Sequence, residues 1–495
     1  MTAAITGTLV RDLLLCERRA DLDVNGDASR RDEVSDFVRM LWDQGCVHED
    51  AIVEALPGTV VDLRDLPAGV RFGATLAAMD DRPDWIVGGR LEAGDRVGVP
   101  DLLRLDEAGW SVGDVKSGQA FDPAGRPNRE YAVQVGHYGA LLGELGLGDP
   151  DRAFVVGRDG RPVWYDLTAP RGDRPSIADE VDGLVDWARS IVEGTAVTRP
   201  ALSAACGMCH WRGVCRAELD AASDVTLVAG LGRALRDVVE PLAPTVPMLA
   251  ALSDAQVRGA SVPGLGRSRL LRFRDRARLL STSGAKPFAR APLGLRRYDR
   301  ELHLDLESDP MSDGLVYLHG VVVIEDGREE YHAFFAERPE DEGRAFAEAW
   351  AFLNSPAGGH VFHYSRFERT SYRVLARRYP EVCTAEEVEA LFSRARSTDL
   401  LVDAVQPLTE WPTNGVGIKP LAKWLGFNWR DRDASGAASI AWFHEWLEAG
   451  SAAVRRRIEE YNHDDCRATA VLLEALIELP VLSEAPWPVA EPAAA

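Results

Sequence analysis

The stretch GVPDLLRLDEAGWSVGDVKSG, residues 98–118, contains two short runs of strand-forming residues separated by a polar turn. This pattern predicts a hairpin with Asp101 on its first strand and Asp114-Val115-Lys116 at the end of its second. Side chains two residues apart on a strand share a face, so the Asp114 carboxylate and the Lys116 ammonium point together. Asp101 and Asp114 would be cross-strand neighbours. The sequence therefore predicts two acids and one base in a single pocket.

Two neighbouring carboxylates repel each other unless a cation neutralises them, and Mg²⁺ or Mn²⁺ held in this way activates water and shields a phosphodiester. A surface hairpin with ordinary solvated charges is the alternative. His48, in a helical pattern over 39–56, shares a face with Leu41 and Ile52 and is expected to point inward, as a ligand or as a hydrogen-bonded core residue. Gln134 and Tyr138, four residues apart, share another helix face.

The length and net charge of the chain limit its domain organisation and its partners. A chain of 495 residues predicts two to four domains, and α/β patterning occurs in two regions. Lys and Arg total 56 against 78 Asp and Glu, so the net charge of 56 − 78 = −22 disfavours non-specific binding to polyanions. Any contact with nucleic acid must be local. With no secretory pattern and no membrane-spanning run, we expect a cytoplasmic protein without a membrane partner.

Clustered cysteines suggest a metal centre near residue 210. Cys206, Cys209 and Cys215 are close enough in sequence to converge on one centre, and Cys16 could supply a fourth ligand. Packed, inert thiols are the alternative, although CGMCHWRGVC is polar and loop-like. His210 keeps a Cys₃His zinc site open.

Taken in order, these motifs resemble the RecB-type PD-(D/E)XK nucleases that carry an iron–sulfur cluster, over residues 1–218. The resemblance implies a restriction-endonuclease-like domain in which Lys116 is catalytic and Gln134 and Tyr138 support the site or contact DNA. It implies metal ligands on four residues: His48, Asp101, Asp114 and, through its backbone carbonyl, Val115. It also favours a [4Fe–4S] cluster over Zn²⁺ on the four cysteines.

A second set of acids lies in the C-terminal half. Asp305 and Glu307 alternate on a predicted strand with Leu304 and Leu306, so both carboxylates face one side. Tyr461 and Asp465 are four apart on a predicted helix. Acids from distant segments could surround two metal ions that stabilise the attacking and leaving oxygens of a phosphodiester. Chance occurrence of such short patterns is the alternative.

Between these pairs, HYSRFERTSY (363–372) offers Glu368, while Asp399 and Asp403 follow in STDLLVDAV. The order DLE, FE, TDLL, GIKPLAKWLGF, YNHDD resembles the RNase H-like DEDD exonucleases, in their YprB-like branch, over 301–478. The resemblance implies metal binding by Asp305, Glu307 and Asp465, with Tyr461 orienting the attacking water. Glu368 departs from the usual Asp and is taken as the fourth ligand, with Asp399 as a weaker substitute.

A basic segment connects the two regions. Residues 267–300 carry ten Arg and one Lys against two Asp, a local charge of 11 − 2 = +9. VPGLG (262–266) followed by arginines resembles the helix–hairpin–helix pattern, in which backbone N–H groups hold a phosphate. Predicted nucleic-acid contacts are Gly264, Gly266, Arg267, Arg269 and Arg272. A linker whose arginines are solvated or paired with acids is the alternative.

The whole chain resembles the RecB-like nuclease family. The resemblance implies a PD-(D/E)XK domain (1–218), a helical basic linker (219–300), a DEDD exonuclease domain (301–480) and a tail (481–495). We expect a metal-dependent nuclease acting on single-stranded or flapped DNA ends in processing or repair. The sequence has no GxxxxGK[ST] motif, so strand separation would need a separate helicase. A catalytically reduced adaptor for a helicase and an RNA-processing exonuclease are the alternatives.

Overall fold

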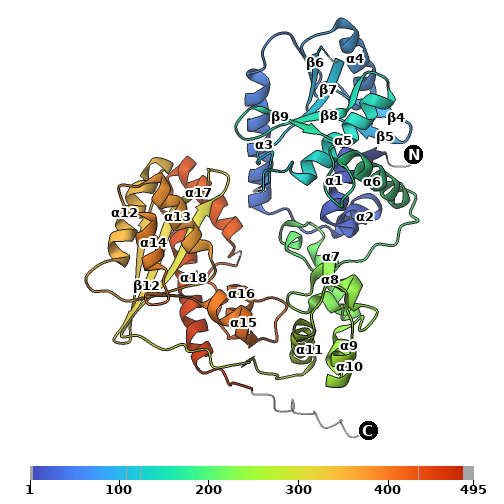
Figure 1. The fold of residues 1–495 in the computed structure, drawn as a ribbon. Helices are drawn as coiled ribbons and strands as arrows, with labels where there is room; N and C mark the ends of the chain where they lie inside the picture. Colours follow the sequence, from blue (N-terminus) through green and yellow to red (C-terminus); the bar gives the residue numbers. More distant parts are fainter. Residues whose placement is uncertain (1–3, 108, 123, 433, 483–495) are drawn as a thin grey trace. The chain divides into compact units, whose positions relative to one another are not determined.

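The computed structural model describes residues 4–107, 109–122, 124–432 and 434–482. Contacts divide the chain into two compact units (Figure 1). The first holds the residues up to Pro200 and Ala204–Arg216, and the second holds Ala201–Ser203 and the residues from Ala217 onward. The segment predicted as a linker, 219–300, is thus grouped with the C-terminal region. Most of the predicted tail, from residue 483, lies outside the described residues.

The first unit is built on a mixed six-stranded sheet. In spatial order its strands are β2 (Val60–Asp62), β3 (Trp85–Val87), β6 (Leu102–Asp106), β7 (Gly109–Val115), β8 (Gly148–Val156) and β9 (Pro162–Asp166). β6 and β7 form the predicted hairpin, with Leu102 opposite Gly113. β7 then pairs in parallel with β8. A smaller sheet contains β1 (Ile5–Thr6), β5 (Arg96–Gly98) and β4 (Leu91–Ala93).

Helices surround this sheet. They are α1 (Gly7–Leu15), α2 (Glu17–Asn25), α3 (Asp36–Glu54), α4 (Ala68–Asp81), α5 (Arg129–Glu144) and α6 (Ile177–Val192), with 3₁₀ turns η1 (Ala28–Arg30) and η2 (Ala204–Met208). Helix α7 (Arg212–Ala222) begins in this unit and continues into the second. The central helix α5 packs on β7 and β8. It begins at Asn128, whose side chain accepts a hydrogen bond from the Glu130 N–H and so satisfies a free donor of the first turn. The apolar face of α5 therefore covers the strands that carry the first predicted site.

The second unit starts with a helical segment that has its own apolar core. Its elements are η3 (Val225–Leu227), α8 (Gly232–Val239), α9 (Val246–Ala251), α10 (Asp254–Gly259) and α11 (Arg267–Ser281). Leu270, Phe273 and Ala277 place one face of α11 in this core. The helical character predicted for this segment is confirmed.

A five-stranded sheet follows, in the order β13 (Arg328–Phe335), β12 (Leu315–Glu325), β11 (Arg300–Asp309), β14 (His360–His363) and β15 (Ser397–Asp399). The first three strands are antiparallel, and β14 and β15 run parallel to β11. β11 therefore lies at the centre of the sheet. The three predicted strand runs and the strand near HVFHY are all present. Phe288–Ala289 (β10) and Thr409–Glu410 (β16) form a separate two-stranded ladder.

Helices cover both faces of this sheet (Figure 1). Leu302, Leu304 and Leu306 pack with α12 (Glu342–Leu353), α13 (Phe367–Arg378) and α14 (Ala385–Leu391). The long helix α18 (Ala452–Ile477) crosses β11 and β12, with α16 (Ile418–Trp424) and α17 (Gly436–Ala449) beside it. The remaining turns are η4 (Pro339–Asp341), the π-helical η5 (Leu400–Val405) and α15 (Gln406–Leu408).

Candidate active sites

The three acids Asp305, Glu307 and Asp465 come together where α18 crosses β11. Each offers one carboxylate oxygen, and these oxygens lie within 4.8 Å of one another. Asp305 and Glu307 alternate on β11 with the buried Leu304 and Leu306, as predicted. In the described part of the chain, this is the one group of three or more His, Cys, Asp or Glu side chains that meets so closely.

The three carboxylates repel one another inside the protein. Burial, followed by the charge of Asp465, raises the pKa of Glu307 to about 8. Burial and the charges of Asp465 and Glu307 also raise the pKa of Asp305 well above its usual value. Burial raises the pKa of Asp465, and the positive charge of Lys419 acts in the opposite direction. Because hard oxygen donors that repel each other are the ligands Mg²⁺ and Mn²⁺ prefer, this donor set fits a divalent cation.

Tyr461 lies beside these acids on α18. Burial and the neighbouring carboxylates raise the pKa of its phenol, so the group stays protonated at neutral pH. The Lys419 ammonium donates a hydrogen bond to the phenol oxygen at 2.7 Å and another to the Ala434 carbonyl at 3.0 Å. Lys419 therefore fixes the position of the phenol oxygen. Sequence reasoning quoted the segment that contains Lys419 but gave this residue no role.

Two further residues hold the carboxylates in place, and sequence reasoning missed both. The Asn462 amide donates to Asp305 Oδ2 at 2.8 Å and lies 3.5 Å from Glu307 Oε1. The Trp429 indole donates to Asp465 Oδ1 at 2.7 Å. Gly320 faces Asp305 on the neighbouring strand, and a Cβ there would lie 1.5 Å from Asn462 Oδ1, so only glycine leaves room for the amide.

Glu368 and Asp399 were the two candidates for a fourth ligand. Asp399 Oδ1 accepts hydrogen bonds from the N–H groups of Ser365, Leu401 and Val402, which makes it the cap of η5. Glu368 is 2% exposed, and its charge contributes to the raised pKa of Asp305. It lies outside the 4.8 Å group, with His363 Nδ1 3.4 Å from its Oε2. Glu368 as a ligand stays a prediction.

The first predicted site has the cross-strand geometry expected of its hairpin. Asp101 Oδ2 accepts a hydrogen bond from the Val115 N–H at 2.8 Å, and Asp114 Oδ1 accepts one from the Asp101 N–H at 3.4 Å. Lys116 Nζ lies 2.5 Å from Asp114 Oδ2. The two acids and the base therefore share one pocket. The Val115 carbonyl as a metal ligand stays a prediction.

Electrostatics in this pocket differ from residue to residue. Burial and the Asp114 charge raise the pKa of Asp101 well above its usual value. Burial opposes the charge on Lys116, but Asp114 and Asp101 outweigh it, and the pKa of the ammonium is raised. Lys116 is therefore positively charged across the neutral range, ready to balance a developing negative charge.

The flanking residues Gln134, Tyr138 and His48 have different degrees of support. The Gln134 amide donates to the Tyr138 phenol oxygen at 3.0 Å, as their spacing on α5 predicts. Burial and the charge of Asp114 raise the pKa of Tyr138, which places this phenol near the acids. His48 Nε2 on α3 is buried without a hydrogen-bond partner in the described residues. His48 does not join Asp101 and Asp114 in a group within 4.8 Å, so its ligand role stays a prediction.

Of the four predicted cluster cysteines, Cys16 is the N-cap of α2, Cys206 lies in η2, Cys209 follows η2, and Cys215 lies in α7. Burial raises the pKa of the Cys209 thiol, and the charges of Cys16 and Cys206 add to this effect, so these residues are neighbours. Cys209 and Cys215 both pack against Trp211 and Val214. His210, the alternative zinc ligand, has its Nε2 2.6 Å from Asp23 Oδ1. The fold thus places Cys16 near Cys206 and Cys209, but among the described residues these thiols do not form a group within 4.8 Å, so the shared centre stays a prediction.

Most arginines of the basic segment bond within the protein. Arg272 and Arg276 pair with Glu410, Arg274 with Asp254 and Asp275, and Arg278 donates to backbone carbonyls. The alternative of paired arginines therefore describes Arg272, Arg274 and Arg278 better than free phosphate contacts, and it corrects the prediction for Arg272. Gly264 has a positive φ of 69°, and Gly266 is the N-cap of α11. Arg267 and Arg269 are exposed at its first turn.

None of the helices in the described residues combines the length and the apolar character needed to cross a membrane. A search of curated proteins found no match. Two family models match the chain: the PD-(D/E)XK nuclease superfamily over residues 3–216 and the RNase H superfamily over residues 302–477. Each contains one of the carboxylate sites described above. The chain therefore joins a domain of the PD-(D/E)XK nuclease superfamily to a domain of the RNase H superfamily.

Proposed function

We propose that this protein is a divalent-metal-dependent exonuclease that digests single-stranded or flapped DNA ends in DNA processing or repair. The observation that carries the proposal is the meeting of Asp305, Glu307 and Asp465 within 4.8 Å. These three residues, with Glu368 nearby, would hold Mg²⁺ or Mn²⁺. Such an ion supplies positive charge to the scissile phosphate and lowers the pKa of bound water.

The protein groups around that site have distinct tasks. The neutral Tyr461 hydroxyl donates or accepts a hydrogen bond with the attacking water, and the Lys419 ammonium holds its oxygen in place. Asn462 and Trp429 keep the carboxylates oriented. Preorganised groups of this kind lower the barrier because they need no rearrangement during reaction. Tyr461 and Lys419 are thus proposed to set the direction of attack.

The pocket of Asp101, Asp114 and Lys116 is proposed as a second active centre. Asp101 and Asp114 would hold a divalent ion, with His48 and the Val115 carbonyl as further ligands. Lys116 is close enough to Asp114 to sit beside the scissile phosphate and to stabilise the charge that develops there. Gln134 and Tyr138 would line the same pocket or contact DNA.

The test is a cleavage assay with end-labelled DNA and RNA oligomers of matched sequence, in Mn²⁺ and in EDTA. Asp114→Ala and Asp305→Ala each inactivate one centre, and the double variant should cut at least about 10³-fold more slowly than wild type. Asp80→Ala and Glu381→Ala remove exposed acids and serve as controls. Undiminished cutting by the double variant would refute both assignments. Faster digestion of RNA would favour the RNA-processing alternative, and no digestion of any oligomer would favour the adaptor.

We also propose that Cys16, Cys206, Cys209 and Cys215 hold a [4Fe–4S] cluster. Cys16 and Cys206 lie near Cys209, and Cys209 and Cys215 pack against the same apolar cluster, which supports a shared centre. Thiolate-to-iron charge transfer predicts a brown protein that absorbs broadly near ~400 nm. Iron and sulfide analysis of protein purified without oxygen would check this. A colourless protein with stoichiometric zinc would assign Zn²⁺ instead.

A further inference from the structure

A pocket of about 370 Å³ lies on α11 in the second unit, away from the acids of β11 and α18. It is lined by Gly230, Ser268, Arg269, Arg272, Phe273 and Arg276. Three of its six lining residues are arginines and none is an acid. The lining is therefore basic in a chain whose net charge is −22.

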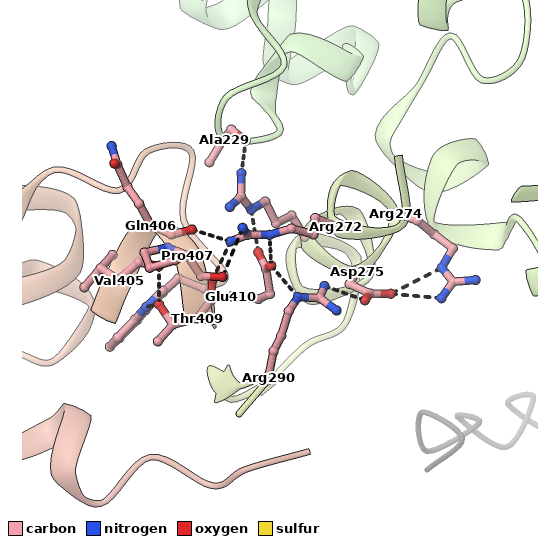
Figure 2. Close-up of polar contacts among 12 residues, drawn as sticks. Ala229, Arg272, Arg274, Asp275, Arg290, Val405, Gln406, Pro407, Thr409 and Glu410 are labelled. Carbon is pink, nitrogen blue, oxygen red and sulfur yellow. Dashed lines mark hydrogen bonds and ion pairs between the residues drawn. The ribbon is translucent and has the colours of Figure 1, made fainter. Parts of the chain in front are cut away.

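A buried carboxylate holds two of these arginines in place. Glu410 is fully buried, and its oxygens accept hydrogen bonds from Arg272 Nε at 2.5 Å and Arg276 Nε at 2.6 Å. Arg290 Nε donates to the same group at 2.7 Å. Figure 2 shows Arg272 and Arg290 converging on Glu410, with Arg272 also reaching carbonyls of the segment 406–409. Both oxygens of Glu410 are thus occupied, and the guanidinium groups are preorganised.

Donors facing the pocket remain free. Arg276 Nη1 donates to the Ala229 carbonyl at 2.6 Å, whereas its Nη2 has no hydrogen-bond partner among the described residues. Arg269 lies over the Phe273 ring at 5.3 Å and makes one long contact of 3.5 Å with the Gly230 carbonyl. The Ser268 hydroxyl is exposed at the first turn of α11. Both guanidinium groups lie beside Gly230 in the lining of the pocket.

The charges of this cluster do not cancel. Five arginines (269, 272, 274, 276 and 290) meet three acids (Asp254, Asp275 and Glu410), which leaves 5 − 3 = +2. Asp254 and Asp275 are engaged by Arg274 and Arg290, so they do not neutralise the pocket. Guanidinium groups bind phosphate oxygens through paired, charge-assisted hydrogen bonds. A group with two negative oxygens is the ligand that these donors match.

We propose that this pocket binds a backbone phosphate of the nucleic-acid strand, through Arg269 and Arg276, and so anchors that strand on the second unit. The inference rests on the proposed nuclease function and names a contact for its substrate. Arg269 is already among the nucleic-acid contacts predicted from the sequence, and the pocket adds Arg276, which belongs to neither the Gly264–Gly266 turn nor the first turn of α11. A free mononucleotide or inorganic phosphate carries the same chemistry.

The test measures binding without cleavage. The full chain carrying Asp114→Ala and Asp305→Ala is titrated onto a fluorescein-labelled single-stranded DNA 20-mer, and anisotropy gives the Kd at several salt concentrations. Arg269→Ala should raise the Kd about five- to tenfold and reduce the salt slope by about 0.7, the value for one lost contact on a single strand. Arg258→Ala removes an equally exposed arginine on α10 that does not line the pocket, and it should change neither value.

A second arm separates the sources of phosphate. Thermal shift with dAMP and with inorganic phosphate is measured for the same variants. If Arg269→Ala removes a dAMP-induced shift but leaves DNA affinity unchanged, the strand assignment is overturned in favour of a free nucleotide. If Arg269→Ala and Arg258→Ala give the same results in both experiments, the proposal that this pocket binds phosphate is refuted. The binding and cleavage results can also disagree. If Arg269→Ala binds DNA more weakly but the wild-type protein does not cut DNA, the phosphate-binding proposal stands and the nuclease proposal is refuted.

Discussion

The two candidate active sites balance their negative charge in different ways. In the first unit, Asp101 and Asp114 face one ammonium, and Lys116 Nζ lies 2.5 Å from Asp114, for a formal sum of 1 − 2 = −1. In the second unit, three carboxylates meet while the Lys419 ammonium bonds to Tyr461 and Ala434, for a sum of 1 − 3 = −2. Under our proposal, Lys116 would offset part of the negative charge at the first site, whereas the second site would depend more on a bound divalent ion.

The largest expected contrast concerns the two lysines. Lys116→Met, in an Asp305→Ala background, should slow the remaining cleavage about 10²- to 10⁴-fold, because its charge acts at the acids themselves. Lys419→Met, in an Asp114→Ala background, should slow cleavage about tenfold, because it acts through the Tyr461 phenol. Initial rates on labelled single strands measure both. Equal losses would remove the distinction between the two sites.

The second contrast is a pH dependence of stability in EDTA. Burial and the charge of Asp465 raise the pKa of Glu307 from its ordinary value of 4.5 to about 8, so between these limits the folded state binds more protons than the unfolded state. The free energy of unfolding must then fall as pH rises through that window, by on the order of 3 kcal/mol. Denaturation at pH 5, 6.5 and 8 measures the fall. Glu307→Gln should flatten the profile, and an unchanged slope in that variant would contradict the assignment.

Adding Mn²⁺ should also distinguish the two candidate active sites. At a Mn²⁺ concentration of 100 times Kd, one bound ion stabilises the folded state by about 2.7 kcal/mol. We expect Asp305→Asn to remove more of the Mn²⁺-induced rise in Tm than Asp114→Asn does, because three carboxylates converge at the second site. Calorimetry at pH 8 follows the rise. A larger loss in Asp114→Asn would reverse our ranking of the two sites.

The smallest expected effect tests the support of Asp465. Trp429→Phe keeps the aromatic ring but deletes the 2.7 Å hydrogen bond to Asp465 Oδ1, which is worth about 1–3 kcal/mol for a charged acceptor. Mn²⁺ affinity of the second site should fall several-fold. The four cysteines proposed as cluster ligands and the first site should be unaffected. Trp424→Phe, at a partly exposed tryptophan on α16, is the matched control. Identical Mn²⁺ affinities would show that Trp429 does not support the ligand.

Local periodicity explains which parts of the sites were predictable. Asp305 and Glu307 share a face because strands repeat every two residues, and Gln134 meets Tyr138 because helix positions four apart are neighbours. The hairpin register that brings Asp101 to Asp114 follows from the short turn between β6 and β7. These contacts lie within one element or one hairpin, so sequence spacing determines them.

Contacts between distant elements were not predictable in the same way. Trp429 reaches Asp465 from the segment after α16, and Asn462 fits only because Gly320 leaves space on β12. The sequence left open whether the arginines of α11 contact phosphates or pair with acids, since their partner Glu410 lies more than 130 residues away. Only packing of α11 beside β16 reveals that pairing, and spacing carries no signal of it.

The most direct test of the central claim is a crystal structure of the protein soaked in Mn²⁺, with anomalous data. Our account predicts an anomalous peak about 2.1 Å from carboxylate oxygens of Asp305, Glu307 and Asp465, and a second peak at Asp101 and Asp114. Absence of density at both sites, in crystals that bind Mn²⁺ elsewhere, would contradict it.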